Sequence, residues 1–355
     1  MNKLLMTVLL LAAPCAAAQT IPAVPPGQMP SVAPVAAPVQ TTADQTVPAT
    51  FKLSAPVGST LELTSTTTTR MSISDVQVAA APGSKVSAAK LNEIRRSMTA
   101  GLNKASSLQA MTFSGKTFVK VAGRDAAGNT TLIATTSQNL PKAPGASRAG
   151  PQTITMKVTE VISPEGKLTN LKVESDNSQL TAMFKSLSAD KLNSVVEQQG
   201  GTFTGVYGAP LVPGMPQTKT TKVDAQSLLS GLLTSVAGPQ GQQMFGQVQA
   251  TPMTATVTTT YKGTDAQGRH IFATRSAYNP WQVSLQAAAG SKTPMQMKLQ
   301  LADMKSGGTT LYRADGLPSS MQQSSDMNMK VTMIVEGIQI SMTMTMNQQM
   351  TMQAR

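Results

Sequence analysis

The chain contains very few of the residues that enzymes and metalloproteins use as nucleophiles, bases or ligands. Its 355 residues include one cysteine, Cys15, one histidine, His270, and one tryptophan, Trp281, and aromatic residues make up 3% of the sequence. One histidine and one cysteine cannot form a zinc site of the usual Cys/His type. A Ser-His-Asp arrangement would depend on His270, and the sequence has no G-x-S-x-G nucleophile motif. The composition therefore argues against zinc-dependent and serine-hydrolase chemistry.

Acidic residues are also scarce. The chain has 17 Asp and Glu and 29 Lys and Arg, which gives a formal net charge of +12 at pH 7. A basic surface attracts anionic envelope polymers and lipid head groups. The basic residues are scattered, however, with only Arg95 and Arg96 adjacent, and no block of them is interleaved with aromatic residues as in a nucleic-acid groove. We expect no nucleic-acid partner, and the partner stays open between envelope lipid and an anionic envelope polymer.

The first residues have the pattern of a cleavable signal peptide. Lys3 supplies a positive charge, Leu4–Ala13 is an apolar run, and Ala16–Ala18 provides the small residues that signal peptidase requires. A membrane-spanning helix needs about 20 apolar residues, more than this run offers before Pro14. We therefore expect residues 1–18 to be removed and the protein to be exported to the periplasm or cell surface, with no transmembrane segment after removal.

Cleavage after Ala18 would start the mature chain at Gln19 and leave it without cysteine. Such a chain has no disulfide, no thiol nucleophile and no thiolate ligand for a metal. Cys15 follows the apolar run, as the acylated cysteine of a lipoprotein does, although Pro14 stands where such sites carry Gly or Ala. Lipidation of Cys15 is the open alternative.

Residues 19–50 are rich in Pro, Ala, Val, Thr and Gln, and Asp44 is their only charged residue. A segment of this composition cannot bury a core, and its prolines favour an extended, disordered spacer. The spacer either holds the folded part away from a surface or is a leader without a specific role.

From Phe51 onward the sequence reads mainly as antiparallel strands, and an internal repeat favours two related units, 51–200 and 201–355. Gly123–Gly128 (GRDAAG) recurs as Gly263–Gly268 (GTDAQG), each time between two alternating strands. The Asp-x-x-Gly tetrapeptide supplies the turn residue and the left-handed glycine that a hairpin loop needs. We predict a mainly β fold in which each unit is an antiparallel sheet, the two halves forming one sheet or two.

Helical periodicity recurs in front of each hairpin, at residues 86–102 and 228–236, and predicts an amphipathic helix packed on each sheet. A third helix, over 180–196 and ending at Gly200–Gly201, would join the two units. Behind each hairpin we expect a second strand pair, over 153–174 and 295–316.

The clearest pattern is the methionine-rich segment that ends the second unit, where apolar residues alternate with polar ones on either side of Glu336–Gly337. Strict period two predicts two strands with one apolar face. With Glu336–Gly337 as the turn, the expected cross-strand pairs are Val335–Ile338, Met333–Ile340, Val331–Met342 and Met329–Met344.

The segment Gly308–Pro318 has the pattern G-x7-G-x-P and leads into the Met/Thr-rich strands. In this pattern, its signal, its Pro-rich spacer and its two β-meander units, the chain resembles uncharacterised bacterial exported envelope proteins. More loosely, it is similar to the curved antiparallel sheets of periplasmic lipoprotein carriers, which wrap a helix against a lipid-binding face. The resemblance covers the second half of the chain and implies a non-enzymatic envelope protein, and no residue role carries over.

Three short motifs occur in the order that penicillin-binding proteins and class A β-lactamases use: S-x-x-K at Ser87–Lys90, S-D-N at Ser175–Asn177 and a K-T-G-like Lys305–Gly307. S-x-x-K also occurs at Ser188–Lys191, which shows how readily it arises. The interval between the first two motifs holds strands in place of the helical domain of that family, and Lys305–Gly308 reads more simply as a loop between strands. Acyl-enzyme chemistry is therefore our third hypothesis.

The 23 methionines suggest copper(I), because thioethers are soft ligands. Met342, Met344 and Met346 would share one strand face, yet methionine also fills cores and lines adaptable apolar surfaces. His270 reads as a polar strand-edge residue, and Trp281 as either a ligand-stacking residue or a cap on the sheet. We assign no catalytic, cofactor-binding or metal residue. The preferred function is a binding or structural protein whose sheet holds an apolar ligand or envelope component, and the alternative is a methionine-based copper(I) carrier.

Overall fold

A computed structural model of the chain describes residues 48–105, 111–140, 152–177, 181, 205–223, 226, 247–286 and 295–355. Within these ranges the fold is mainly β, and the strands form a single antiparallel sheet of 13 strands. The predicted fold class is confirmed at this level, and the two halves share one sheet. The predicted signal peptide and nearly all of the spacer lie outside the described residues.

The first half of the chain contains β1 (Thr60–Ala80), α2 (Ala88–Ala105), β2 (Met111–Arg124), β3 (Thr130–Leu140), β4 (Gln152–Ile162) and β5 (Leu168–Ser175). The second half contains β6 (Pro216–Val223), β7 (Gln247–Ala250), β8 (Met253–Thr264), β9 (His270–Tyr278), β10 (Trp281–Gln286), β11 (Met295–Tyr312), β12 (Pro318–Val335) and β13 (Ile338–Ala354).

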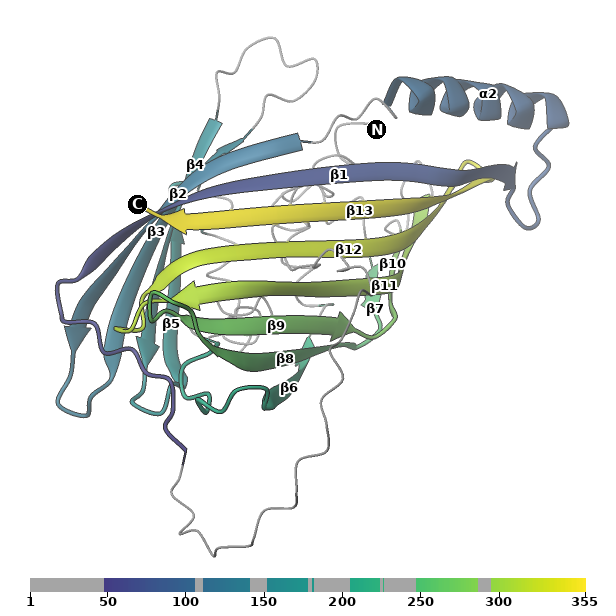
Figure 1. The fold of residues 1–355 in the computed structure, drawn as a ribbon. Helices are drawn as coiled ribbons and strands as arrows, with labels where there is room; N and C mark the ends of the chain where they lie inside the picture. The colour runs from purple at the N-terminus through teal and green to yellow at the C-terminus, as the bar shows by residue number, and fades with distance from the viewer. Residues whose placement is uncertain are drawn as a thin grey trace, which may run out of the picture.

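The strands follow the order β5-β4-β3-β2-β1-β13-β12-β11-β9-β8-β6. The sheet thus has two wings, β1 to β5 and β6 to β12, and β13 joins them by pairing with β1 on one side and β12 on the other. Along β11 the second wing forks, since the first part of β11 pairs with β10 and the last part with β9. Figure 1 shows β1, β13, β12 and β11 running side by side and β2 to β5 turning away from them, so the sheet is curved.

The closing hairpin β12–β13 has the predicted register. Val335 pairs with Ile338, Met333 with Ile340, Val331 with Met342 and Met329 with Met344. Ile338, Met342, Met344 and Met346 are buried on one face of β13, whereas Asn347, Gln349 and Thr351 are exposed on the other. We call the first the inner face of the sheet and the second the outer face.

The two predicted Asp-x-x-Gly hairpins are present, as β2–β3 and β8–β9, and they have the same hydrogen bonds. Asp125 Oδ1 accepts the backbone N–H groups two and four residues on, at 3.0 and 2.9 Å. Asp265 Oδ1 accepts the corresponding N–H groups at the same 3.0 and 2.9 Å. Gly128 and Gly268 both have positive φ, 84° and 73°. The Asx geometry explains why this tetrapeptide forms a tight turn in both places.

The loop predicted at Lys305–Gly308 is wrong. These residues lie in the middle of β11, where Gly307 pairs with Arg275 of β9 and with Ser324 of β12. Pairing on both edges satisfies the backbone and overrides the local turn preference of Gly-Gly. The strand pair predicted over 295–316 is wrong for the same reason, because Met295–Tyr312 form one long strand and the turn comes only after it.

The turn after β11 is Arg313–Gly316, and it has the same backbone hydrogen bonds as the β4–β5 turn at Ser163–Gly166. In each, the fourth residue donates to the carbonyl of the first, at 2.9 Å in both turns. The strand after each turn also contains a register shift at an equivalent place, opposite Ile162 of β4 in one case and opposite Tyr312 of β11 in the other.

Two chain segments, residues 49–55 and 206–211, close the end of the sheet at which these turns lie, and we call them the closing segments. They pair with each other, because Phe51 N–H donates to Ala209 O at 2.8 Å and Gly208 N–H donates to Phe51 O at 2.8 Å. The first segment also binds the β11–β12 turn, where Ala55 N–H donates to Asp315 O at 2.8 Å.

The helix α2 matches the first predicted helix, and Ser87 caps it, since Lys90 N–H donates to Ser87 Oγ at 3.3 Å. Leu91, Ile94 and Met98 are half-buried on one side of the helix. Figure 1 shows α2 beside the end of β1. The other two predicted helices lie outside the described residues, and no described helix is long and apolar enough to cross a membrane.

Candidate functional site

The three motifs of the acyl-enzyme hypothesis lie on separate elements, and each is held by local bonds. Ser87 caps α2. Ser175, at the end of β5, donates from Oγ to Thr155 O at 2.9 Å. Lys305, in β11, forms an ion pair with Asp303 at 2.8 Å. Ser188–Lys191 lies outside the described residues.

His270 begins β9 and packs among aromatic rings. Its Nδ1 lies 3.1 Å from the hydroxyl of Tyr261, and its ring meets the ring of Phe51 edge-on with centroids 5.0 Å apart. Burial lowers the pKa of His270. Among the residues that the structure describes, no three His, Cys, Asp or Glu side chains come close enough to hold a metal ion.

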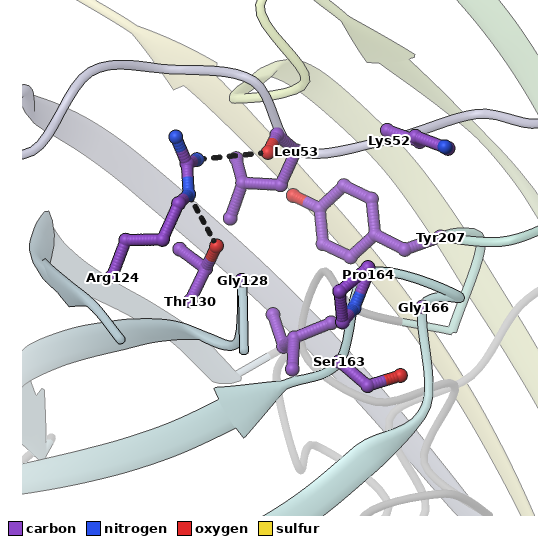
Figure 2. A pocket seen from close by; sticks show the side chains of 10 residues that line it. Lys52, Leu53, Arg124, Gly128, Thr130, Ser163, Pro164, Gly166 and Tyr207 are labelled. Atoms are coloured by element: carbon purple, nitrogen blue, oxygen red, sulfur yellow. Dashed lines mark hydrogen bonds between the residues drawn. The ribbon is translucent and has the colours of Figure 1, made fainter. Parts of the chain in front are cut away.

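A pocket of about 130 Å³ lies at the closed end of the sheet (Figure 2). Two basic residues, Lys52 and Arg124, line this pocket. Arg124 Nε donates to Thr130 Oγ1 at 3.0 Å, and its Nη2 donates to Leu53 O at 3.1 Å. Arg124 therefore fixes the first closing segment to the sheet. Ligand pockets for small molecules usually exceed about 300 Å³, so this pocket is too small to hold a typical small-molecule ligand.

Beside this pocket, the inner face carries most of the aromatic residues of the described chain in one group. We call it the aromatic cluster, and its buried rings are Phe51, Tyr207, Tyr261, Phe272 and Tyr312. Tyr207 also donates its hydroxyl to Gly316 O at 2.8 Å, and burial raises the pKa of that hydroxyl well above its usual range. The aromatic cluster is the hydrophobic core of the closed end.

Farther along the strands, the inner face changes from aromatic to sulfur-containing side chains. Met71, Met346, Met327 and Met304 stand directly opposite one another on β1, β13, β12 and β11. They belong to what we call the methionine cluster: Met71, Met297, Met304, Met327, Met329, Met333, Met342, Met344 and Met346. The placement of Met342, Met344 and Met346 on one strand face, expected from the sequence, is confirmed.

Between the aromatic and methionine clusters, polar side chains occupy inner-face positions. Five adjacent strands each contribute one residue, and every residue stands directly opposite the next. We call this the polar row, and its members are Thr69, Gln348, Ser325, Ser306 and Ser276, with exposed fractions of 2%, 6%, 2%, 5% and 6%.

Several atoms of this row have no bonding partner. Thr69 Oγ1, Gln348 Oε1 and Ser306 Oγ are buried and make no hydrogen bond in the part of the chain that the structure describes. More than nine in ten buried polar groups of native proteins are paired. Two of these oxygens, on Thr69 and Gln348, lie on the adjacent strands β1 and β13, and the third, on Ser306, lies two strands beyond Gln348.

Sequence reasoning missed the polar row, although a signal existed. In β13 the alternation runs Met342, Met344, Met346, then Gln348, then Met350, so a glutamine takes the place of an apolar residue in the apolar phase. Thr69 and Ser306 give no such signal, because polar or small residues, Thr67 and Gly308, continue the same face of their strands. Their meeting in one row depends on the pairing of strands far apart in sequence.

Trp281 begins β10 and packs against Leu301, Met304 and Met346. Its indole Nε1 is buried and unpaired within the described ranges. The lone tryptophan thus lies at the border of the methionine cluster, so its fluorescence should report ligand binding to that cluster.

No protein-family model, no curated protein and no solved structure matches the chain.

Proposed function

We propose that the protein is an exported, non-enzymatic cell-envelope protein that binds an apolar ligand or apolar envelope component on the inner face of its sheet. The observation that carries the proposal is the methionine cluster, in which Met71, Met327, Met329 and Met333 stay half-buried. Methionine is flexible and unbranched, so a surface lined with it adapts to varied apolar shapes. Apolar surface beside a polar border is typical of a binding site.

The signal-peptide pattern of residues 1–18 supports the exported location, in the periplasm or at the cell surface. The non-enzymatic part is supported by the local bonds that occupy Ser87, Ser175 and Lys305. Mass spectrometry of the native protein would read out both the mature N-terminus and any lipid on Cys15.

The same proposal includes two related units that share one sheet. It is supported by the matching hydrogen bonds of the two Asp-x-x-Gly turns. It is also supported by a matching backbone hydrogen bond just ahead of the first strand of each wing. Gly58 N–H donates to Val121 O ahead of β1, and Gly214 N–H donates to Tyr261 O ahead of β6, both at 2.8 Å. Val121 and Tyr261 occupy the same position before their Asp-x-x-Gly turns.

The binding proposal is tested with the fluorescent apolar probe N-phenyl-1-naphthylamine. We expect saturable binding to the purified protein and a loss of affinity in Met327→Gln and Met329→Gln. Each substitution places an amide against the ligand and weakens binding by about tenfold, a value derived from the free energy of burying an apolar side chain.

The matched control is Lys330→Gln, on the same strand but exposed on the outer face. It should bind the probe as the wild type does. Native mass spectrometry of protein from envelope extract should also show a co-purified apolar molecule. A clean mass of the bare chain, together with no saturable probe binding, would count decisively against the proposal.

The second candidate function is copper(I) binding, favoured by the row Met71, Met346, Met327 and Met304. Directly opposite residues on adjacent strands have Cβ atoms about 5 Å apart, and a thioether side chain is long enough for neighbours to share one ion. Copper(I) prefers such soft ligands.

Leucine substitutions separate the two candidates, because leucine keeps the apolar surface and removes the sulfur. A triple variant, Met304→Leu, Met327→Leu and Met346→Leu, should lose copper(I) in a competition titration if the row binds the metal, and should keep the naphthylamine probe. Equal copper(I) affinity in variant and wild type would remove this candidate.

A further inference from the structure

The polar row contains three buried oxygens that have no hydrogen-bond partner in the described chain. Thr69 on β1 stands opposite Gln348 on β13, and Ser306 lies two strands farther on β11. Each of the three has a buried oxygen without a partner in the described chain. Burying a polar atom without a hydrogen bond destabilises a protein, so the adjacent oxygens of Thr69 and Gln348 indicate a partner from outside the described part of the chain.

The position of the row relates it to the methionine cluster. Met71, Met346 and Met304 lie two residues away from Thr69, Gln348 and Ser306 along their strands, on the same inner face and on the same side of the row. Two residues of a strand span about 7 Å. A single elongated molecule lying along the strands therefore touches the polar row with one end and the methionine cluster with the rest.

The chemistry of the row defines the polar end of that molecule. The oxygen Gln348 Oε1 can only accept a hydrogen bond, whereas the hydroxyls of Thr69 and Ser306 can donate or accept. All five members of the row are neutral, and a buried charge needs a charged or metal partner. The complementary group is thus neutral and has an N–H or O–H donor.

We propose that the ligand is a neutral amphipathic lipid whose hydroxyl or amide group donates to Gln348 and pairs with Thr69, which stands directly opposite it, while its hydrocarbon chain lies on the methionine cluster. This inference rests on the proposed apolar-binding function and adds the ligand class and its orientation. It separates neutral long-chain alcohols and amides, which fit, from fatty-acid anions and pure hydrocarbons.

The test compares two probes with the same chain, hexadecanol and hexadecyl methyl ether, of which only the alcohol has a donor. Binding is followed by displacement of N-phenyl-1-naphthylamine and by the emission of Trp281, the single tryptophan, which packs against Met304 and Met346. The wild type should prefer the alcohol by at least about tenfold, because a site with buried polar groups rejects the analogue that leaves them unpaired.

The variant Gln348→Met restores the apolar alternation of β13 and should abolish the preference while keeping the affinity for the ether. Thr69→Val, which removes a hydroxyl at nearly constant shape, should reduce the preference in the same direction and serves if Gln348→Met does not fold. Gln349→Met, on the exposed outer face of the same strand, is the control and should keep the full preference.

Equal binding of alcohol and ether by the wild type would overturn this inference and leave the apolar-binding function standing, since water would then complete the row. A preference that survives unchanged in Thr69→Val and Gln348→Met would also overturn it. Failure of the naphthylamine probe and of both long-chain probes to bind would overturn the proposed function itself.

Discussion

The ring of Phe51 stacks on the ring of Tyr207 with centroids 5.6 Å apart and an interplanar angle of 15°. The two residues belong to the two closing segments, which lead into β1 and β6, the first strands of the two wings. The stack therefore couples both wings at the closed end, and the hydrogen bond from Tyr207 to Gly316 adds a third point of attachment.

Replacing Phe51 with Ala should lower the free energy of unfolding by about 3–5 kcal/mol, the usual cost of removing a buried phenylalanine side chain. Phe51 is 2% exposed and packs against four other rings. Phe118→Ala, at a ring that is 47% exposed, is the control and should change stability by about 0.5 kcal/mol or less. Urea unfolding measures both, and equal losses would contradict the described closure.

Gly316→Ala should destabilise the protein more than Gly268→Ala. Both glycines have positive φ, 87° and 73°, so both substitutions cost about 1 kcal/mol or more of backbone strain. A Cβ at 316 would also lie 2.5 Å from Lys52 O, whereas at 268 it would meet nothing within 4 Å. The difference between the two variants, measured by thermal unfolding, reports the contact with the closing segment. If the two variants unfold at the same temperature, the contact between Gly316 and the closing segment contributes nothing to stability.

The Asp125 turn should make stability depend on acidity. The side-chain amide of Asn129, followed by backbone N–H groups, lowers the pKa of Asp125. A lowered folded-state pKa adds stability above the unfolded pKa, about 3.9, and this is lost as the pH falls through the folded pKa. Asp125→Asn should therefore melt below the wild type at neutral pH, and the gap should shrink below about pH 4. A gap that stays constant would refute this origin.

Glu336→Asn should stabilise the closing hairpin by several tenths of a kcal/mol to about 1 kcal/mol. Glu336 and Gly337 have φ of 51° and 76°, the conformation of a two-residue type I′ turn, in which Asn-Gly is preferred. Glu336→Gln removes the same charge without the left-handed preference and should leave the stability unchanged. Urea unfolding of the two variants tests the idea, and an equal gain in both would assign the effect to charge.

The closing hairpin could be predicted in full from the sequence because it depends on local information. Its turn is two residues long, and strict alternation on both sides of Glu336–Gly337 leaves one register that buries the apolar residues. The Asp-x-x-Gly turns could be predicted for a similar reason, since the side chain of Asp125 accepts hydrogen bonds from the backbone of its own loop.

The interior of β11 could not be predicted from local sequence in this way. Gly307 and Gly308 have a strong local preference for turns, and only pairing with β9 and β12 keeps them extended. The polar row could not be predicted from the sequence for the same physical reason. Thr69 and Gln348 are neighbours only because β13 returns to pair with β1, and no local pattern reports that pairing.

The position of β13 has a consequence for biosynthesis. β13 alone bonds to both wings in the described sheet, and it follows them in the chain. While the ribosome is still making residues 338–354, β1 and β12 therefore present open edges that invite wrong pairing. The methionine cluster and the polar row are complete only when that last strand has paired with β1 and β12, so the ligand-binding face forms last.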